Sequence, residues 1–154
     1  MRPEEELRFL VLAAQREGSR GLTAALAPLE LTPAQAEVVR CLADYGPMSL
    51  RELGAMLVCE SGSPSRLVDS MVKREIVTRM EDASDRRSVT LALTAEGKRL
   101  DRGVRKVEDA LYRQIGGLLG AEGIGKALAL LRPLVSGSPG GEAIARRKAA
   151  EGKK

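Results

Sequence analysis

The stretch of residues 80–97 constrains the fold more than any other part of the chain. Over residues 88–93, apolar side chains alternate with polar or small ones, which is the period of a half-buried β-strand. Residues 76–81 have a similar strand-like composition, and the polar residues 82–87 between the two segments suit a hairpin loop. Thr94 then provides a typical N-cap for a helix. The sequence therefore predicts a β-hairpin that leads directly into a helix.

Three short helical patterns precede this hairpin, over residues 31–46, 49–57 and about 60–74. The first two open with capping boxes, in which a Thr or Ser is followed three residues later by Gln or Glu. Each pattern carries an apolar stripe at helical spacing. Three helices followed by a two-stranded hairpin are the element order of a winged helix-turn-helix lobe, which we expect at residues 31–94.

Two longer helical segments flank this lobe, at residues 4–27 and 95–135. Glycines close to residue 118 predict a break in the second segment. Residues 136–154 read as a Gly/Ser/Pro linker and a basic tail that is flexible or weakly helical. The expected fold is therefore mainly α with a small β-hairpin wing, divided into a winged helix-turn-helix lobe and a helical lobe.

Composition excludes several classes of protein. The 154 residues include no histidine, which removes His-based catalysis and His-containing metal sites. The sequence also lacks a metal-ligand cluster, a Gly-rich phosphate loop and a nucleophile motif, so neither an enzyme nor a bound cofactor is expected. No apolar run approaches the ~20 residues that span a bilayer. Because the acidic N-terminus does not resemble a signal peptide, we expect a cytoplasmic protein with no membrane partner.

The third helix and the tip of the hairpin carry polar side chains suited to contacting double-stranded DNA. An α-helix fits the major groove, which is about 12 Å wide, and an arginine on a wing can enter the narrower minor groove. The net charge of +4 agrees weakly with such a polyanionic partner. The predicted contacts, with Asp85 orienting Arg87, are Ser61, Ser63, Ser65, Arg66, Asp69, Ser70, Lys73, Asp85, Arg86 and Arg87.

Several motifs together resemble the DNA-binding lobe of MarR-type transcriptional regulators. They are LTPAQ, SLRELG, SRLVDSMVKR, DRRSV and LTAEG, and the resemblance covers roughly residues 5–135. It implies a homodimer in which residues 4–27 and 95–135 form the dimerisation lobe, because those helices cannot bury their apolar stripes on the winged lobe alone. It also implies a pseudo-palindromic operator, with one recognition helix on each half-site.

The resemblance further implies a sequence-specific regulator of transcription, most simply a repressor that a small-molecule effector releases. Aromatic and phenolic acids are frequent effectors in the family, bound between the two lobes. Arg16 and Arg20 on the first helix are weak candidates to meet a carboxylate, because charge on a solvated helix surface is the simpler explanation of both.

Three residues depart from the pattern or leave an alternative open. Glu75 stands where the family usually has glycine, so a different turn is expected there, and Pro64 replaces a β-branched residue. Cys59 enters the third helix, where a thiolate is favoured, which suggests a thiol-based redox-sensing regulator as an alternative. Cys41 is expected to be a core residue. A winged-helix protein-interaction module that does not read DNA is a further alternative, and weak dependence of DNA association on salt would favour it.

Overall fold

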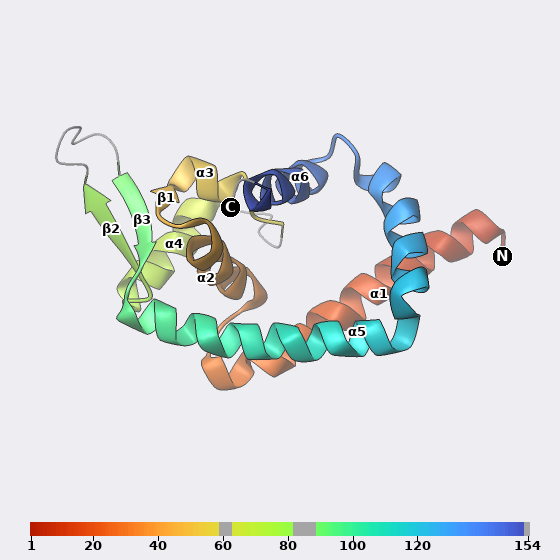
Figure 1. The fold of residues 1–154 in the computed structure, drawn as a ribbon, viewed down its shortest axis with the longest axis horizontal. Helices are drawn as coiled ribbons and strands as arrows, with labels where there is room; N and C mark the ends of the chain where they lie inside the picture. Colours follow the sequence, from red (N-terminus) through yellow and green to blue (C-terminus); the bar gives the residue numbers. More distant parts are fainter. Residues whose placement is uncertain (59–62, 82–88, 153–154) are drawn as a thin grey trace.

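The computed structural model describes residues 1–58, 63–81 and 89–152 (Figure 1). Its elements are α1 (Pro3–Leu26), the 3₁₀ turn η1 (Ala27–Leu29), α2 (Pro33–Tyr45), β1 (Met48–Ser49), α3 (Leu50–Gly54), α4 (Pro64–Lys73), β2 (Val77–Glu81), β3 (Val89–Leu93), α5 (Ala95–Val135) and α6 (Pro139–Glu151). Helices predominate beside one small sheet, which confirms the predicted fold class. None of the described helices combines the length and the apolar character that crossing a bilayer requires.

The predicted capping boxes begin α2 and α3. The Thr32 hydroxyl accepts a hydrogen bond from the Gln35 amide at 3.2 Å, and the Thr32 amide donates to the Gln35 side chain at 3.0 Å. Ser49 and Glu52 make the same reciprocal pair at 3.2 and 2.8 Å. Both pairs satisfy amide groups that lack partners inside the helix, so these two helices start where the sequence predicts.

The three strands form one antiparallel sheet in the order β1-β3-β2. β2 and β3 pair along their full length, which confirms the hairpin. Residues 82–88, which connect these two strands, lie outside the described residues. β1 was not predicted, because it is only two residues long and its second residue, Ser49, is also the cap of α3, so it carries no alternation that a pattern could detect. Its pairing of Met48 with Leu91 ties the sheet to the helix-turn-helix.

The hydrophobic core lies within the winged lobe and at the inner ends of α1 and α5. Its most deeply buried side chains are Leu26, Val38, Val39, Cys41, Leu53, Val68, Met71, Ile76, Val77, Leu91 and Val104. α1 contributes only Leu26 to this group, and α5 contributes Val104. Most of the length of both helices therefore lies outside the core.

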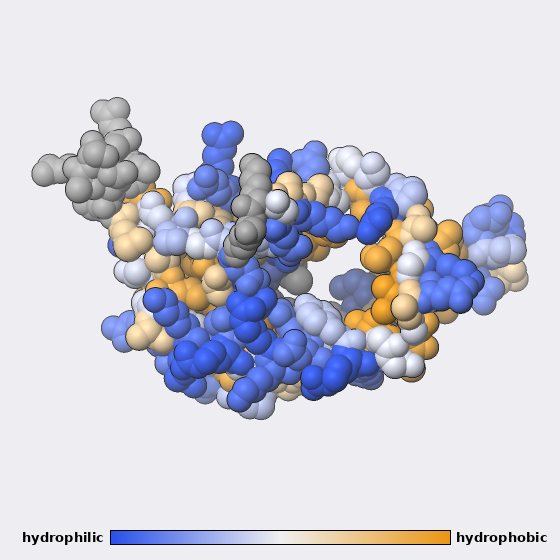
Figure 2. Space-filling view, in the orientation of Figure 1, coloured by the Kyte–Doolittle hydropathy of each residue, from blue (hydrophilic) through white to orange (hydrophobic). Residues whose placement is uncertain are grey.

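The outer parts of α1 and α5 expose apolar side chains. Gly120, at φ 63° and ψ 173°, interrupts α5 and divides it into a proximal part (95–119) and a distal part (121–135), close to the predicted break. Apolar side chains that are at least 44% exposed there include Leu7, Phe9, Leu10, Leu118, Leu119, Leu128, Leu130, Leu131 and Leu134. Figure 2 shows hydrophobic residues gathered over the distal part of α5. Apolar surface of this extent usually marks an interaction site.

The hairpin and α5 meet in a close junction. The Thr94 hydroxyl accepts a hydrogen bond from the Gly97 amide at 3.0 Å and donates to the Glu75 carbonyl at 2.5 Å. The Thr94 amide donates to the Ile76 carbonyl at 3.1 Å. The same threonine therefore caps α5, as predicted, and holds the turn that follows α4.

The C-terminal segment differs from the expected flexible or weakly helical tail. Residues Pro139–Glu151 form the helix α6, which begins where the Ser138 hydroxyl accepts from the Gly141 amide at 3.2 Å. α6 returns to the winged lobe and buries Ala143 there (Figure 1). The linker is only the turn at residues 136–138. The charge- and glycine-rich composition of this segment did not indicate a stable helix, because the helix is stabilised by contacts with residues that are distant in the sequence.

The turn at Glu75, which was expected to differ from a glycine turn, keeps the glycine-like conformation. The φ of 54° at Glu75 is left-handed, so this glutamate keeps the conformation that glycine supplies most easily. Because side chains are strained there by about 1–3 kcal/mol, we expect Glu75→Gly to raise the free energy of unfolding by about 1 kcal/mol. Glu75→Ala should bring no such gain, because alanine retains the strain. Chemical denaturation of both variants measures the difference, and an equal change in both would contradict this explanation.

Candidate nucleic-acid interface

α4 presents a polar face on the side opposite the core. Val68 and Met71 are fully buried beneath the helix, whereas Arg66 and Lys73 are exposed and Ser65 is half-buried. Arg66 and Lys73 are seven residues apart, which is two helical turns, so they lie near one face. The helix therefore offers an outward basic surface, as the sequence predicts.

Two predicted contact residues of α4 already have partners within the protein. Asp69 Oδ1 accepts a hydrogen bond from Arg79 Nη2 on β2 at 2.5 Å. Ser70 donates its hydroxyl hydrogen to the Leu67 carbonyl at 2.7 Å. Both members of the Asp69–Arg79 pair are almost half exposed, so the pair itself adds little stability. Its effect is geometric, because it holds a wing arginine beside the outer face of α4.

Arg79 is a candidate interface residue that sequence reasoning missed. Residues 76–81 were interpreted only as a strand, and strand periodicity does not report which helix a side chain will meet. A signal was present, however, since Arg79 is a cation in the strand directly after the predicted recognition helix.

Of the other predicted contacts, only Ser63 lies among the described residues. Ser63 is the exposed N-cap of α4, and its side chain makes no capping hydrogen bond. The remaining residues lie outside the described part of the chain and stay predictions: Ser61, Asp85, Arg86 and Arg87, together with the redox candidate Cys59.

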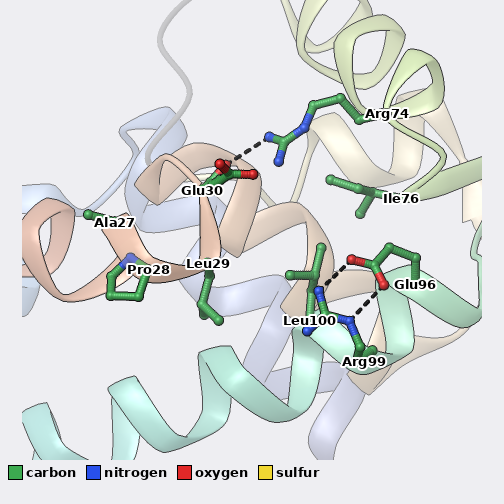
Figure 3. Close-up of a pocket in the computed structure, with 9 residues that line it drawn as sticks. All are labelled: Ala27, Pro28, Leu29, Glu30, Arg74, Ile76, Glu96, Arg99 and Leu100. Atoms are coloured by element: carbon green, nitrogen blue, oxygen red, sulfur yellow. Dashed lines mark hydrogen bonds and ion pairs between the residues drawn. The ribbon is translucent and has the colours of Figure 1, made fainter.

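A pocket of about 360 Å³ lies where η1, the turn after α4 and the start of α5 meet (Figure 3). Its apolar wall is formed by Leu29, Ile76 and Leu100. Two arginines from different elements, Arg74 and Arg99, stand at its polar side. The pocket therefore combines an apolar wall with a polar side that carries two arginines and two glutamates, Glu30 and Glu96.

Both pocket arginines are held in place. Arg74 Nη1 donates to the Glu30 carbonyl at 2.8 Å, which joins the end of α4 to the segment after η1. Arg99 donates to both carboxylate oxygens of Glu96, at 2.7 and 2.6 Å. These hydrogen bonds lower the pKa of Glu96 below its ordinary value, so the carboxylate keeps its charge.

Arg16 and Arg20 do not line this pocket. Both lie on the exposed outer part of α1, beside a shallow hollow that Phe9 and Leu12 of the same helix also line. Arg20 pairs with Glu17 at 3.2 Å, and both side chains are largely exposed. Their surroundings are those of a helix surface and not of a site between the lobes.

Cys41 is a core residue, as predicted. Its side chain is buried, and burial raises the pKa of the thiol to about 11 despite the nearby Arg147 guanidinium. The thiol is therefore protonated near neutral pH, which makes it a poor target for oxidants.

Comparison with known proteins finds similar sequences and similar folds. Residues 31–89 match the MarR family. HTH-type transcriptional regulator TtmR of Methylorubrum extorquens (strain PA1) is 32% identical over 117 residues, which are 76% of this chain and 58% of TtmR. The chain thus spans less than two thirds of the length of that relative. The relative is named as a regulator of transcription, in agreement with the expectation that this chain is not an enzyme.

Solved structures share the fold. A cysteine-to-serine mutant of MarR from E. coli, complexed with operator DNA, superposes with a TM-score of 0.75 at 24% identity, over 84% of this chain and 94% of that one. BpsR of Bordetella bronchiseptica gives a TM-score of 0.77 at 20% identity, over 90% of this chain and 99% of that one. The winged helix-turn-helix segment of this chain, residues 31–89, thus matches the MarR family, and the chain shares its fold with solved MarR structures.

Proposed function

We propose that this protein is a sequence-specific DNA-binding regulator of transcription. The observation that carries the proposal is the outward basic face of α4, with Arg66 and Lys73 exposed and Arg79 of the wing held beside them. Such a face can lie in the major groove, where arginine contacts guanine edges and lysine neutralises phosphates. The solved MarR complex with operator DNA supports this use of the fold.

The regulator is proposed to act as a homodimer. The exposed apolar surfaces of α1 and of the distal part of α5 are the support for this step, because a second copy would cover both. A two-fold axis through these helices would present two α4 helices to half-sites roughly 34–36 Å apart, and hence to a pseudo-palindromic operator.

The dimer is proposed to be a repressor that a small aromatic acid releases from DNA. Regulation of DNA binding by 6-hydroxynicotinic acid is reported for BpsR, which has the same fold. In this chain the pocket beside Arg74 and Arg99 is the candidate site, since the end of α4 and the start of α5 both line it. A ligand that binds better when these elements are displaced would shift the population of dimers away from the DNA-competent arrangement.

Binding to DNA can be tested with operators selected from a random pool. Fluorescence anisotropy at several salt concentrations should give an affinity that falls steeply as salt rises, because phosphate contacts release counterions. Arg66→Ala and Arg87→Ala should each weaken binding by about 1–3 kcal/mol, which is the value of one good base contact.

Lys106→Ala supplies the matched control, because Lys106 is an exposed cation on α5 outside α4 and the wing. It should change affinity much less than either arginine variant. Affinity that is weak and insensitive to salt would refute DNA reading and favour the protein-interaction alternative. If peroxide leaves wild-type affinity unchanged, the redox alternative built on Cys59 fails.

A further inference from the structure

α6 contacts α2 through side chains that belong to one stripe on each helix. Residues spaced by four lie on one face of a helix, and each stripe has this spacing. The stripes are Glu37, Cys41 and Tyr45 on α2, and Ala143, Arg147 and Glu151 on α6. Polar contacts join them, including the Tyr45 hydroxyl, which donates to Glu151 at 3.3 Å.

Arg147 makes most of these contacts. Its Nε donates to the Met56 carbonyl beyond the end of α3 at 2.8 Å. Its Nη2 donates to Glu37 Oε1 and lies 3.3 Å from Cys41 Sγ. A single side chain of α6 therefore reaches both α2 and the segment that leaves α3.

Glu37 extends this linkage toward the recognition helix. The carboxylate oxygen that accepts from Arg147 also accepts from the Val58 amide at 2.9 Å. Val58 lies in the connection that leads from α3 to α4, and Glu37 itself is buried. Arg147 and Val58 are consequently held by the same atom, so the position of α6 bears directly on the connection to α4.

The docking of α6 depends on these polar contacts more than on apolar burial. Among the described residues of α6, Ala143 is fully buried and Ala150 is partly buried against the core, while Ile144 is 44% exposed. One buried methyl group contributes about 0.8 kcal/mol, which is too little to hold a helix by itself.

We propose that α6 is an intramolecular clasp that fixes Met56 and Val58, at the start of the α3–α4 connection, in the arrangement used for DNA binding, with Arg147 as the residue that closes it. The turn at residues 136–138 joins α6 to the distal part of α5 (Figure 1). A displacement of the distal part of α5 would therefore also displace α6 and the contacts of Arg147. The regulatory part of this inference rests on the proposed function, whereas the clasp itself does not.

Cys41 offers a direct measure of release, because Arg147 covers its thiol. The chain contains two cysteines, so Cys59→Ser leaves Cys41 as the single thiol that can react with a chromogenic disulfide reagent. In that background Arg147→Ala should speed the reaction about tenfold by uncovering the thiol, even though loss of the guanidinium charge by itself raises the pKa of Cys41. Lys148→Ala removes the same charge from the exposed side of α6 and should leave the rate unchanged.

A second variant separates release of α6 from damage at Arg147. Ala143→Glu places a charge on the buried side of α6 and should speed the reaction of Cys41 while Arg147 stays intact. Circular dichroism would check that all variants keep their helices. Unchanged thiol reactivity in both folded variants would overturn the clasp.

DNA affinity tests the regulatory part. If α6 holds the α3–α4 connection, Arg147→Ala and Ala143→Glu should weaken binding to the selected operator about tenfold, and Lys148→Ala should not. Faster thiol reaction with unchanged operator affinity would overturn the proposed control of DNA reading. Failure of the wild type to bind any DNA would instead overturn the proposed function, and thiol reactivity would still decide whether the clasp exists.

Discussion

Replacing Gly97 by alanine is expected to lower the free energy of unfolding by about 3 kcal/mol. A Cβ atom at this position would lie 2.3 Å from the Ile76 carbonyl oxygen and 3.0 Å from the Leu93 side chain. The first contact is with backbone, which also accepts the Thr94 amide and cannot move without opening the junction between hairpin and α5. The loss should exceed the gain of about 1 kcal/mol that alanine brings to a helix. Thermal denaturation should show a midpoint roughly 5–10 °C lower.

Two other glycines of α5 serve as matched controls. At Gly103 an added Cβ would lie 2.8 Å from the flexible end of Leu29, so Gly103→Ala should cost less than Gly97→Ala. At Gly116 nothing lies within 4 Å, and alanine should be neutral or stabilise the helix by up to about 1 kcal/mol. If Gly97→Ala behaved like Gly116→Ala, the close approach of α5 to the turn after α4 would not be a stability determinant.

The parts of the fold that were predictable depend on local signals. Thr32 and Ser49 mark helix starts through partners three residues away, and Thr94 marks the start of α5 in the same manner. The hairpin follows from alternation within five-residue strands. Each of these signals is complete within a short window of sequence, so the winged lobe could be recognised before any long-range contact was known.

The parts that were missed depend on contacts between distant residues. α6 docks through Arg147 onto Glu37, 110 residues earlier, and nothing near Arg147 indicates this partner. A local signal for the helix itself was available, because Ser138 and Pro139 form a typical N-cap and first-turn pair. Asp69 shows that long-range contacts within the site were missed as well. The sequence places Asp69 on the outer face of α4, but it does not reveal that Arg79 donates a hydrogen bond to this carboxylate.

Among the described residues, the largest charged cluster lies between α2 and α5. Arg40 forms an ion pair with Asp44 at 2.7 Å, and it donates to Asp101 at 2.9 Å and to Glu108 at 2.8 Å. Arg105 also bridges Asp101 and Asp44, at 2.9 and 2.8 Å. Arg40 is the more buried of the two arginines, with 17% of its side chain exposed against 45% for Arg105. The winged lobe is thereby held to α5 by an arginine that three carboxylates share.

Arg40→Met should therefore lower the free energy of unfolding by about 3 kcal/mol at pH 8, because it leaves partly buried carboxylates without their main counter-charge. Arg105→Met should cost about 1 kcal/mol, since that side chain is much more exposed and its interactions are screened by water. Chemical denaturation of both variants measures the two losses. Equal losses would show that burial does not distinguish the two arginines.

The pH dependence of that loss identifies its origin. Burial raises the pKa of Glu108 above its ordinary value of 4.5, even though the Arg40 charge opposes the shift. A carboxyl group whose pKa is higher in the folded state binds a proton on folding, so its contribution to stability is favourable at low pH and is lost as pH rises through the folded pKa. Removing Arg40 should raise this pKa further. The loss in Arg40→Met should accordingly shrink to about half between pH 8 and pH 5, and adding Glu108→Gln should recover about 1 kcal/mol at pH 8. A loss that stayed constant with pH would instead come from packing of the Arg40 stem, which methionine replaces only in part.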